Sequence, residues 1–103
     1  MGKNLDSTLI KAVKILAKNR INYWICHGTL LGLIRNQNVI SKSSDIDIAI
    51  WNSKIIKNKI YKIFLKNGFK KKKKFFSGDN LLTFVKKGER EIDITFYEKD
   101  KQN

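Results

Sequence analysis

The chain has 103 residues, the size of one small domain, and its 42% hydrophobic content is enough for one modest core. This composition excludes a disordered tail. The net charge is +13, which favours a polyanionic partner such as nucleic acid. However, only 3 of the 22 basic residues are arginine, and lysine, asparagine and isoleucine all have AT-rich codons. The charge alone therefore leaves two interpretations open, a nucleic acid partner and genome composition.

The single cysteine, Cys26, excludes an intrachain disulfide framework and a cysteine-rich zinc site. No apolar run is long enough to span a bilayer, so no transmembrane segment is expected. Residues 1–13 lack the long apolar stretch and the small-residue cleavage site of a secretory signal. No internal repeat or domain boundary is visible. We therefore expect one cytoplasmic domain over residues 1–103.

Hydrophobic periodicity predicts helices and strands that alternate along most of the chain. Helices are expected over residues 7–18, 30–35 and 54–66, the last beginning at a Ser53 cap and ending at Gly68. Strands are expected over 21–26, 45–51, 72–76, 81–86 and 90–98, with a loop over 36–44 and turns at 77–80 and 87–88. The order α-β-α-β-α-β-β-β predicts a small α/β (α+β) domain with a mixed sheet flanked by about three helices.

Two predicted strands carry carboxylates on their polar face. Side chains two residues apart in a strand point to the same side, so Asp45 and Asp47 share one face and the neighbouring isoleucines share the other. In the last strand, Asp93 faces away from the core together with Glu91 and Thr95. If the two strands are neighbours, Asp45, Asp47 and Asp93 converge on one patch.

Three clustered carboxylates repel one another, and a divalent cation removes that conflict. Hard oxygen ligands suit Mg²⁺ or Mn²⁺, with phosphate oxygens completing the coordination shell. The alternative is that these strands simply turn a charged face to solvent. Aspartate is depleted in strands, and the chain has only 9 acidic residues against 22 basic ones, which counts against that alternative.

Gly28 and Thr29 follow a predicted strand and open a helical stretch. A glycine at such a turn lets backbone N–H groups and the helix N-terminus approach a phosphate, and Thr29 adds a hydroxyl donor. A Gly-Thr pair alone is weak evidence. Together with a D-x-D strand a short loop away, it indicates a site for a nucleoside di- or triphosphate.

The stretches "HGTLLGLIR" and "DIDIAI" resemble the LicD-type (fukutin-related) branch of the nucleotidyltransferase superfamily, and the detailed match covers residues 27–50. The superfamily pattern is G-[S/T], a variable loop, D-x-D and a third carboxylate on a later strand. The resemblance implies Gly28 and Thr29 at the donor phosphates, Asp45 and Asp47 on the metal, Asp93 as third carboxylate and base, and Arg35 at a phosphate or holding the loop. The stretch "SSDIDI" is also similar to minimal nucleotidyltransferases.

These observations predict a metal-dependent transferase. The resemblance implies a nucleotide donor, either a nucleoside triphosphate or a CDP-linked group such as CDP-choline, and a hydroxyl acceptor such as a glycan. Because LicD-type enzymes are longer, two alternatives are left open: the acceptor-binding portion is missing, or a homo-oligomer or partner subunit supplies it.

Two other functions are left open. One is a catalytically silent basic module that binds RNA or a partner protein, with the run Lys70–Lys74 as its contact. The other is the minimal half of a two-component nucleotidyltransferase system. Trp24 and Trp51 flank the motif strands and are interpreted as core residues, with stacking on a base as the alternative.

Overall fold

The computed structural model describes residues 6–36, 45–73 and 80–99. Within these ranges, three helices and five strands follow one another in the predicted order. In chain order they are α1 (Ser7–Lys18), β1 (Trp24–Ile25), α2 (His27–Asn36), β2 (Ile46–Trp51), α3 (Ile56–Lys66), β3 (Lys70–Lys72), β4 (Leu81–Val85) and β5 (Ile92–Tyr97). None of the described helices has the length and hydropathy needed to cross a membrane.

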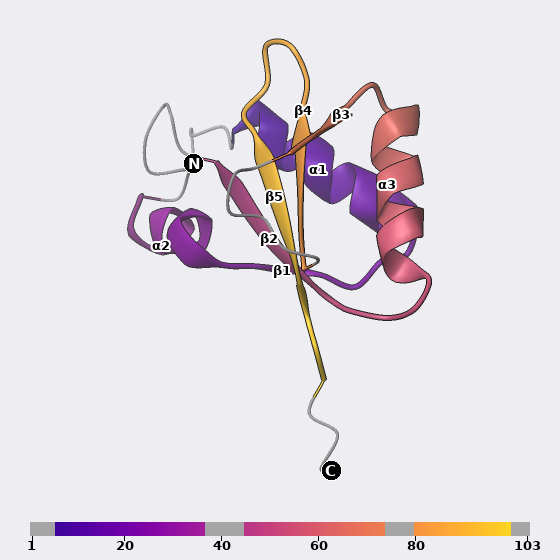
Figure 1. Cartoon of the computed structure of the whole chain (residues 1–103). Coiled ribbons are helices and arrows are strands. Elements are labelled where there is room, and N and C mark those ends of the chain that lie inside the picture. The colour runs from indigo at the N-terminus through magenta and orange to yellow at the C-terminus, as the bar shows by residue number, and fades with distance from the viewer. Residues whose placement is uncertain (1–5, 37–44, 74–79, 100–103) are drawn as a thin grey trace.

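The five strands form one mixed sheet in the order β1-β2-β5-β4-β3 (Figure 1). β2 and β5 run parallel, and every other neighbouring pair is antiparallel. Helices α1 and α3 lie on one side of this sheet, and α2 lies on the other side beside β1 and β2 (Figure 1). The predicted α+β class with a mixed sheet and three helices is confirmed.

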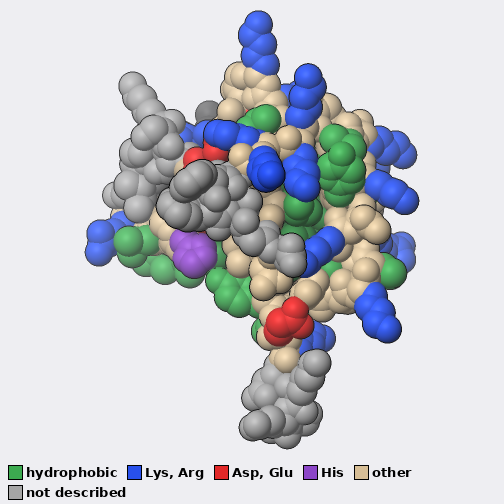
Figure 2. Space-filling view, in the orientation of Figure 1, with side chains coloured by type: hydrophobic (Ala, Val, Ile, Leu, Met, Phe, Trp, Pro, Cys, Tyr) green, Lys and Arg blue, Asp and Glu red, His purple; other side chains and the backbone are tan. Residues whose placement is uncertain are grey.

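The core lies between the sheet and the pair α1 and α3. Alternation along β2 and β5 turns every second residue to this side, where the side chains are 0–2% exposed: Ile46, Ile48, Ile50, Ile92, Ile94 and Phe96. Leu16 of α1 and Phe64 of α3 are fully buried against them. Each such side chain stabilises the fold by about 1.5–3 kcal/mol. Lysine and arginine side chains project from much of the outer surface (Figure 2).

The start of α1 is tied to the segment that leads into β5. Oδ1 of Asp6 caps the helix by accepting from the N–H groups of Thr8 and Leu9 at 2.9 and 3.1 Å. Its Oδ2 accepts from Nε of Arg90 at 2.6 Å. The buried Thr8 hydroxyl donates to Glu89 at 2.7 Å and accepts from the N–H of Arg90 at 3.0 Å. These contacts fix the chain immediately before Glu91 and Asp93.

Two boundaries differ from the prediction for clear reasons. The strand predicted over 21–26 is limited to Trp24–Ile25, because the N–H groups of Arg20 and Ile21 still donate to Ala17 and Leu16 of α1. Helix α3 begins two residues later than predicted, although Ser53 Oγ does accept from the N–H of Ile56 at 3.2 Å.

The other boundaries lie within three residues of the prediction where they can be compared, and the largest difference among them is that α2 begins at His27 rather than at residue 30. Gly68 ends α3 with a φ of +90°, as expected, and Lys87-Gly88 forms the predicted turn. The strand predicted over 72–76 is observed as Lys70–Lys72, and its residues 74–76 lie outside the described residues. Of the loop predicted over 36–44, residue 36 belongs to α2 and residues 37–44 lie outside the described residues, as do residues 77–79 of the predicted turn.

The Asp6 contacts predict a pH-dependent stability. Burial alone would raise the pKa of Asp6, but Arg90 and the N–H groups of Leu9 and Thr8 bring it below its ordinary value of 3.8. The stabilisation is therefore complete above the unfolded pKa and is lost as the pH falls through the lower folded pKa. We expect Asp6→Asn to destabilise the domain at pH 7 by about 1 kcal/mol and to flatten this acid dependence in urea unfolding curves. Equal acid slopes for Asp6→Asn, wild type and the surface control Glu98→Gln would contradict the assignment.

Candidate active site

One face of the sheet carries a row of polar side chains that crosses four strands. The strand register pairs Lys72 with Thr83, Thr83 with Asp93, and Asp93 with Asp47. Paired residues of neighbouring strands point to the same side, so these four lie on one face. This face is opposite the one covered by α1 and α3, because the residues that alternate with them are the isoleucines of the core.

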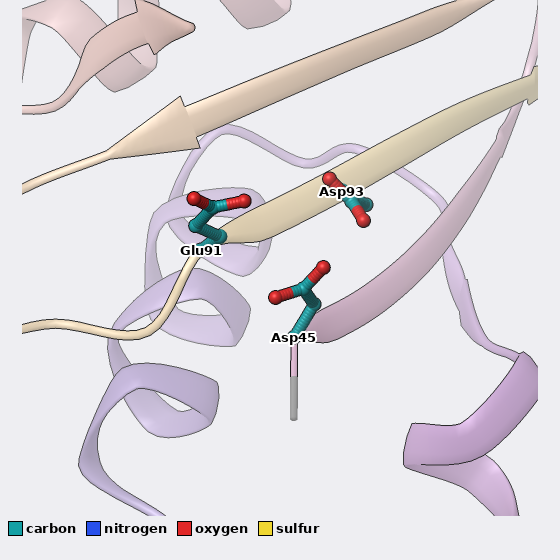
Figure 3. A group of neighbouring side chains, drawn as sticks. All are labelled: Asp45, Glu91 and Asp93. Carbon is teal, nitrogen blue, oxygen red and sulfur yellow. The ribbon is translucent and has the colours of Figure 1, made fainter. Parts of the chain in front are cut away.

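Next to this row, three carboxylates converge. Asp45 immediately precedes β2 and Glu91 immediately precedes β5, and the two positions are adjacent because Ile46 pairs with Ile92. Each of Asp45, Glu91 and Asp93 offers one oxygen that lies within 4.8 Å of the oxygens of the other two. Figure 3 shows the three carboxylates gathered where β2 and β5 begin.

This donor set fits a divalent cation of the Mg²⁺ or Mn²⁺ type. All three residues offer hard carboxylate oxygens, and all three are half-buried, so their mutual repulsion is screened less than at an open surface. An ion at this point would be coordinated by carboxylate oxygens from two strands that are held in fixed register. Mg²⁺ usually combines a few carboxylates with water or phosphate oxygens, so such oxygens would complete the coordination here.

Two neighbours orient these carboxylates. Thr83, which is 1% exposed, donates its hydroxyl to Oδ1 of Asp93 at 2.7 Å. Nζ of Lys72 lies 2.5 Å from Oε2 of Glu91, reaching it diagonally across the sheet. Lys72 thus brings a positive charge from the lysine-rich strand β3 to the edge of the carboxylate group.

Asp47 shares the face but turns toward α2. The hydroxyl of the buried Thr29 accepts from the N–H of Asp47 at 2.8 Å and lies 3.0 Å from the backbone oxygen of Asp45 and 3.1 Å from Oδ2 of Asp47. Burial raises the pKa of Asp47, the Thr29 contacts oppose this, and the negative charge of Asp93 adds to the rise. Thr29 therefore positions both aspartates of the D-x-D motif from within the helix.

Gly28 and Thr29 lie in the first turn of α2, which begins at His27, so the predicted turn is already helical. A Cβ at Gly28 would stand 4.0 Å from Oδ2 of Asp47, in ordinary van der Waals contact. Gly28 thus lies directly beside the Asp47 carboxylate at the positive end of the helix. Arg35 lies in the last turn of α2, roughly 10 Å further along the helix axis by the rise of 1.5 Å per residue.

Cys26 adjoins the site without a reactive thiolate. Burial, reinforced by the negative charge of Asp47, raises the pKa of Cys26 to about 11. The thiol is therefore protonated at neutral pH and is not a nucleophile. The backbone N–H of Cys26 donates to the backbone carbonyl oxygen of Asp47 at 3.1 Å, which continues the β1–β2 pairing.

Of the sequence-predicted carboxylates, Asp45 and Asp93 come together, and Asp47 lies beside them as the register partner of Asp93. Sequence reasoning did not assign Glu91 and Lys72 to the site. Glu91 was detectable, because it alternates with Asp93 on the polar face. Lys72 had no such signal, since it stands within a run of lysines and the sequence does not show which of them pairs with Thr83.

Comparison with known proteins identifies the family of this chain. The family model described as LicD/FKTN/FKRP, nucleotidyltransferase domain, matches residues 20–103. The chain belongs to this family. The match includes β1, α2, β2 and β5, the elements that carry the carboxylates and the Gly-Thr pair.

Two relatives and one solved structure are similar to the chain. An uncharacterized protein of Rickettsia typhi is 36% identical over 89 residues, 85% of this chain and 26% of that protein. The ribitol-5-phosphate transferase FKTN of Macaca fascicularis is 32% identical over 97 residues, 92% of this chain and 21% of that protein. The crystal structure of ANT(2")-Ia in complex with adenylyl-2"-tobramycin has a TM-score of 0.61 and 19% identity, covering 92% of this chain and 52% of that one. This last likeness shows the fold.

The Thr29 contacts predict a specific loss of stability. Thr29→Val removes the acceptor of the Asp47 N–H while keeping the shape of the side chain, so it should cost about 1–3 kcal/mol of unfolding free energy. Thr29→Ser keeps the hydroxyl and loses one methyl group, which should cost about 1 kcal/mol. Urea unfolding followed by circular dichroism measures both. A valine variant as stable as the serine variant would show that the hydroxyl does not hold β2.

Proposed function

We propose that this domain is a divalent-cation-dependent transferase that moves a nucleotidyl or phospho-substituted group from a nucleotide donor to a hydroxyl acceptor. The observation that carries the proposal is the convergence of Asp45, Glu91 and Asp93 within 4.8 Å beside the first turn of α2. Membership of a nucleotidyltransferase-domain family supports it, and so does the similarity to a ribitol-5-phosphate transferase.

The donor phosphates would bind between the carboxylates and α2. Asp45, Glu91 and Asp93, with Asp47 beside them, would hold Mg²⁺ or Mn²⁺, which offsets the negative charge of the phosphates. Gly28 leaves the backbone N–H groups at the start of α2 open to a phosphate oxygen. Lys72 supplies a positive charge on the opposite edge of the carboxylate group. Thr29 and Thr83 keep Asp47 and Asp93 in place as the ligand binds.

Transfer then needs a general base and an in-line approach of the acceptor oxygen to the phosphorus atom. The acceptor hydroxyl oxygen forms a bond to phosphorus, the bond from phosphorus to the leaving phosphate oxygen breaks, and the hydroxyl proton passes to the Asp93 carboxylate. Resemblance to the LicD branch supports a CDP-linked donor such as CDP-choline and a glycan hydroxyl as acceptor.

A thermal-shift experiment tests the cation-dependent donor site. With Mg²⁺, a nucleoside triphosphate or CDP-choline should raise the melting temperature of the wild type by mass action, and EDTA should abolish the shift. Asp93→Asn should lose the shift, because it removes one of the three converging carboxylates. Glu98→Gln, a surface carboxylate just after the same strand, should keep it. An Asp93→Asn protein that binds nucleotide as tightly as the wild type, with or without Mg²⁺, would contradict the proposal.

A second candidate function is a basic binding module, favoured by a hollow of about 550 Å³ between α1 and α3. Five lysines line it together with apolar residues, and they are Lys11, Lys14, Lys18, Lys66 and Lys86. Such a surface attracts a polyanion such as RNA through counterion release. In that case RNA binding should weaken steeply with salt and be unaffected by EDTA, whereas donor binding at the carboxylates should respond to EDTA.

A further inference from the structure

Three aromatic rings gather where β2 and β5 end. The centroids of Trp24 and Trp51 are 4.8 Å apart, and those of Trp24 and Tyr97 are 5.6 Å apart. Trp51 is 42% exposed and Tyr97 is 37% exposed, so neither side chain is fully packed in the core. Trp24 pairs with the fully buried Ala49 and is half-buried. We call these three residues the aromatic platform.

The aromatic platform stands on the same face of the sheet as the carboxylates. Trp51 and Tyr97 are paired in the strand register, and each lies four residues after Asp47 and Asp93, respectively. An even number of residues along a strand keeps the side chains on the same face. Four residues at 3.3 Å each place Tyr97 roughly 13 Å along the strand from Asp93. Both groups therefore belong to one surface, with the carboxylates near its beginning and the rings at its end.

The start of α2 connects the two groups. The ring nitrogen Nε2 of His27 lies 3.4 Å from the hydroxyl of Tyr97, and His27 is the residue immediately before Gly28. His27 also interacts electrostatically with Asp47. A phosphate bound at this helix end would thus have the carboxylates on one side and the aromatic platform on the other. The one histidine side chain of the chain is visible at the surface in Figure 2, beside hydrophobic side chains.

We propose that the aromatic platform binds the nucleobase of the donor nucleotide. This rests on the proposed function, because it assumes that the phosphates of the same donor bind at the carboxylates and α2. Aromatic faces attract the π-face of any base, and stacking is worth more than the area that it buries. Nζ of Lys99 lies over the Trp51 ring, 5.9 Å from its centroid, so a base that stacks on this face would displace the Lys99 side chain. The two tryptophans thus extend a phosphate site into a nucleotide site.

The two tryptophans of the chain are both in the aromatic platform, so intrinsic tryptophan fluorescence reports on it alone. With Mg²⁺ present, the wild type is titrated with CTP, ATP and CDP-choline, and with inorganic tripolyphosphate as a ligand without a base. A nucleotide that stacks should quench or shift the emission and bind at least about fivefold more tightly than tripolyphosphate. Tripolyphosphate should bind with little change in emission.

Variants separate the base from the phosphates, with affinities measured by calorimetry. Trp51→Ala should lower nucleotide affinity at least about fivefold, to near that of tripolyphosphate, and leave tripolyphosphate affinity unchanged. Trp51→Phe retains an aromatic ring, although a smaller one, and its packing against Trp24. It should therefore lose less nucleotide affinity than Trp51→Ala, and it tests the platform even if the alanine variant fails to fold. Tyr61→Ala is the matched control, because Tyr61 is an aromatic residue on α3 that is 38% exposed.

The outcomes distinguish the inference from the function on which it rests. If the wild type binds nucleotides and tripolyphosphate with equal affinity, the aromatic platform does not bind the base, although the phosphate site is still supported. The same conclusion follows if Trp51→Ala lowers the affinity for both ligands equally. Binding of neither ligand with Mg²⁺ overturns both. Nucleotide binding that quenches the tryptophans, exceeds that of tripolyphosphate and falls only in the Trp51 variants supports the inference.

Discussion

The parallel pairing of β2 and β5 is the constraint on which the rest of the structure depends. Both strands bury isoleucine or phenylalanine at every second position, so a slip by one residue would turn the core to solvent. The same register that aligns Ile48 with Ile94 aligns Asp47 with Asp93. Hydrophobic burial on one face thereby fixes acidic neighbours on the other. The energy that holds the like charges together comes from the core behind them.

That arrangement has an electrostatic cost, which the surrounding residues offset in different ways. Thr83 and Thr29 donate or accept hydrogen bonds at Asp93 and Asp47, and Lys72 reaches Glu91. These contacts stabilise the charged forms, but the pKa of Asp47 stays above its ordinary value, chiefly because of burial and to a lesser degree because of the negative charge of Asp93. Lys72 brings one positive charge to the edge of the three converging carboxylates.

Local pattern was sufficient for the element order, the mixed sheet and the convergence of Asp45 with Asp93, because period-2 alternation fixes which face each residue takes. It could not give the partners that register alone decides. Glu91 joins the cluster because Ile46 pairs with Ile92, and Lys72 because β3 pairs with β4 in one particular alignment. The contact of Thr29 with β2 depends on how α2 packs on the sheet, and no hydrophobic periodicity in the sequence predicts that packing. The short β1 was over-predicted since β-branched residues near 21 complete the end of α1 instead.

The two sides of the sheet also divide the charges of the chain. Lysines of α1 and α3 surround a hollow on the helical side, whereas the acidic residues of β2 and β5 face the side of α2. A polyphosphate that approaches the domain is attracted by the positive field of the whole molecule, which raises the rate of encounter. At short range the carboxylates repel it unless a cation lies between them. Under the proposed function, attraction at long range and cation-dependent binding at short range would let a strongly basic chain distinguish a metal-bound nucleotide from other anions.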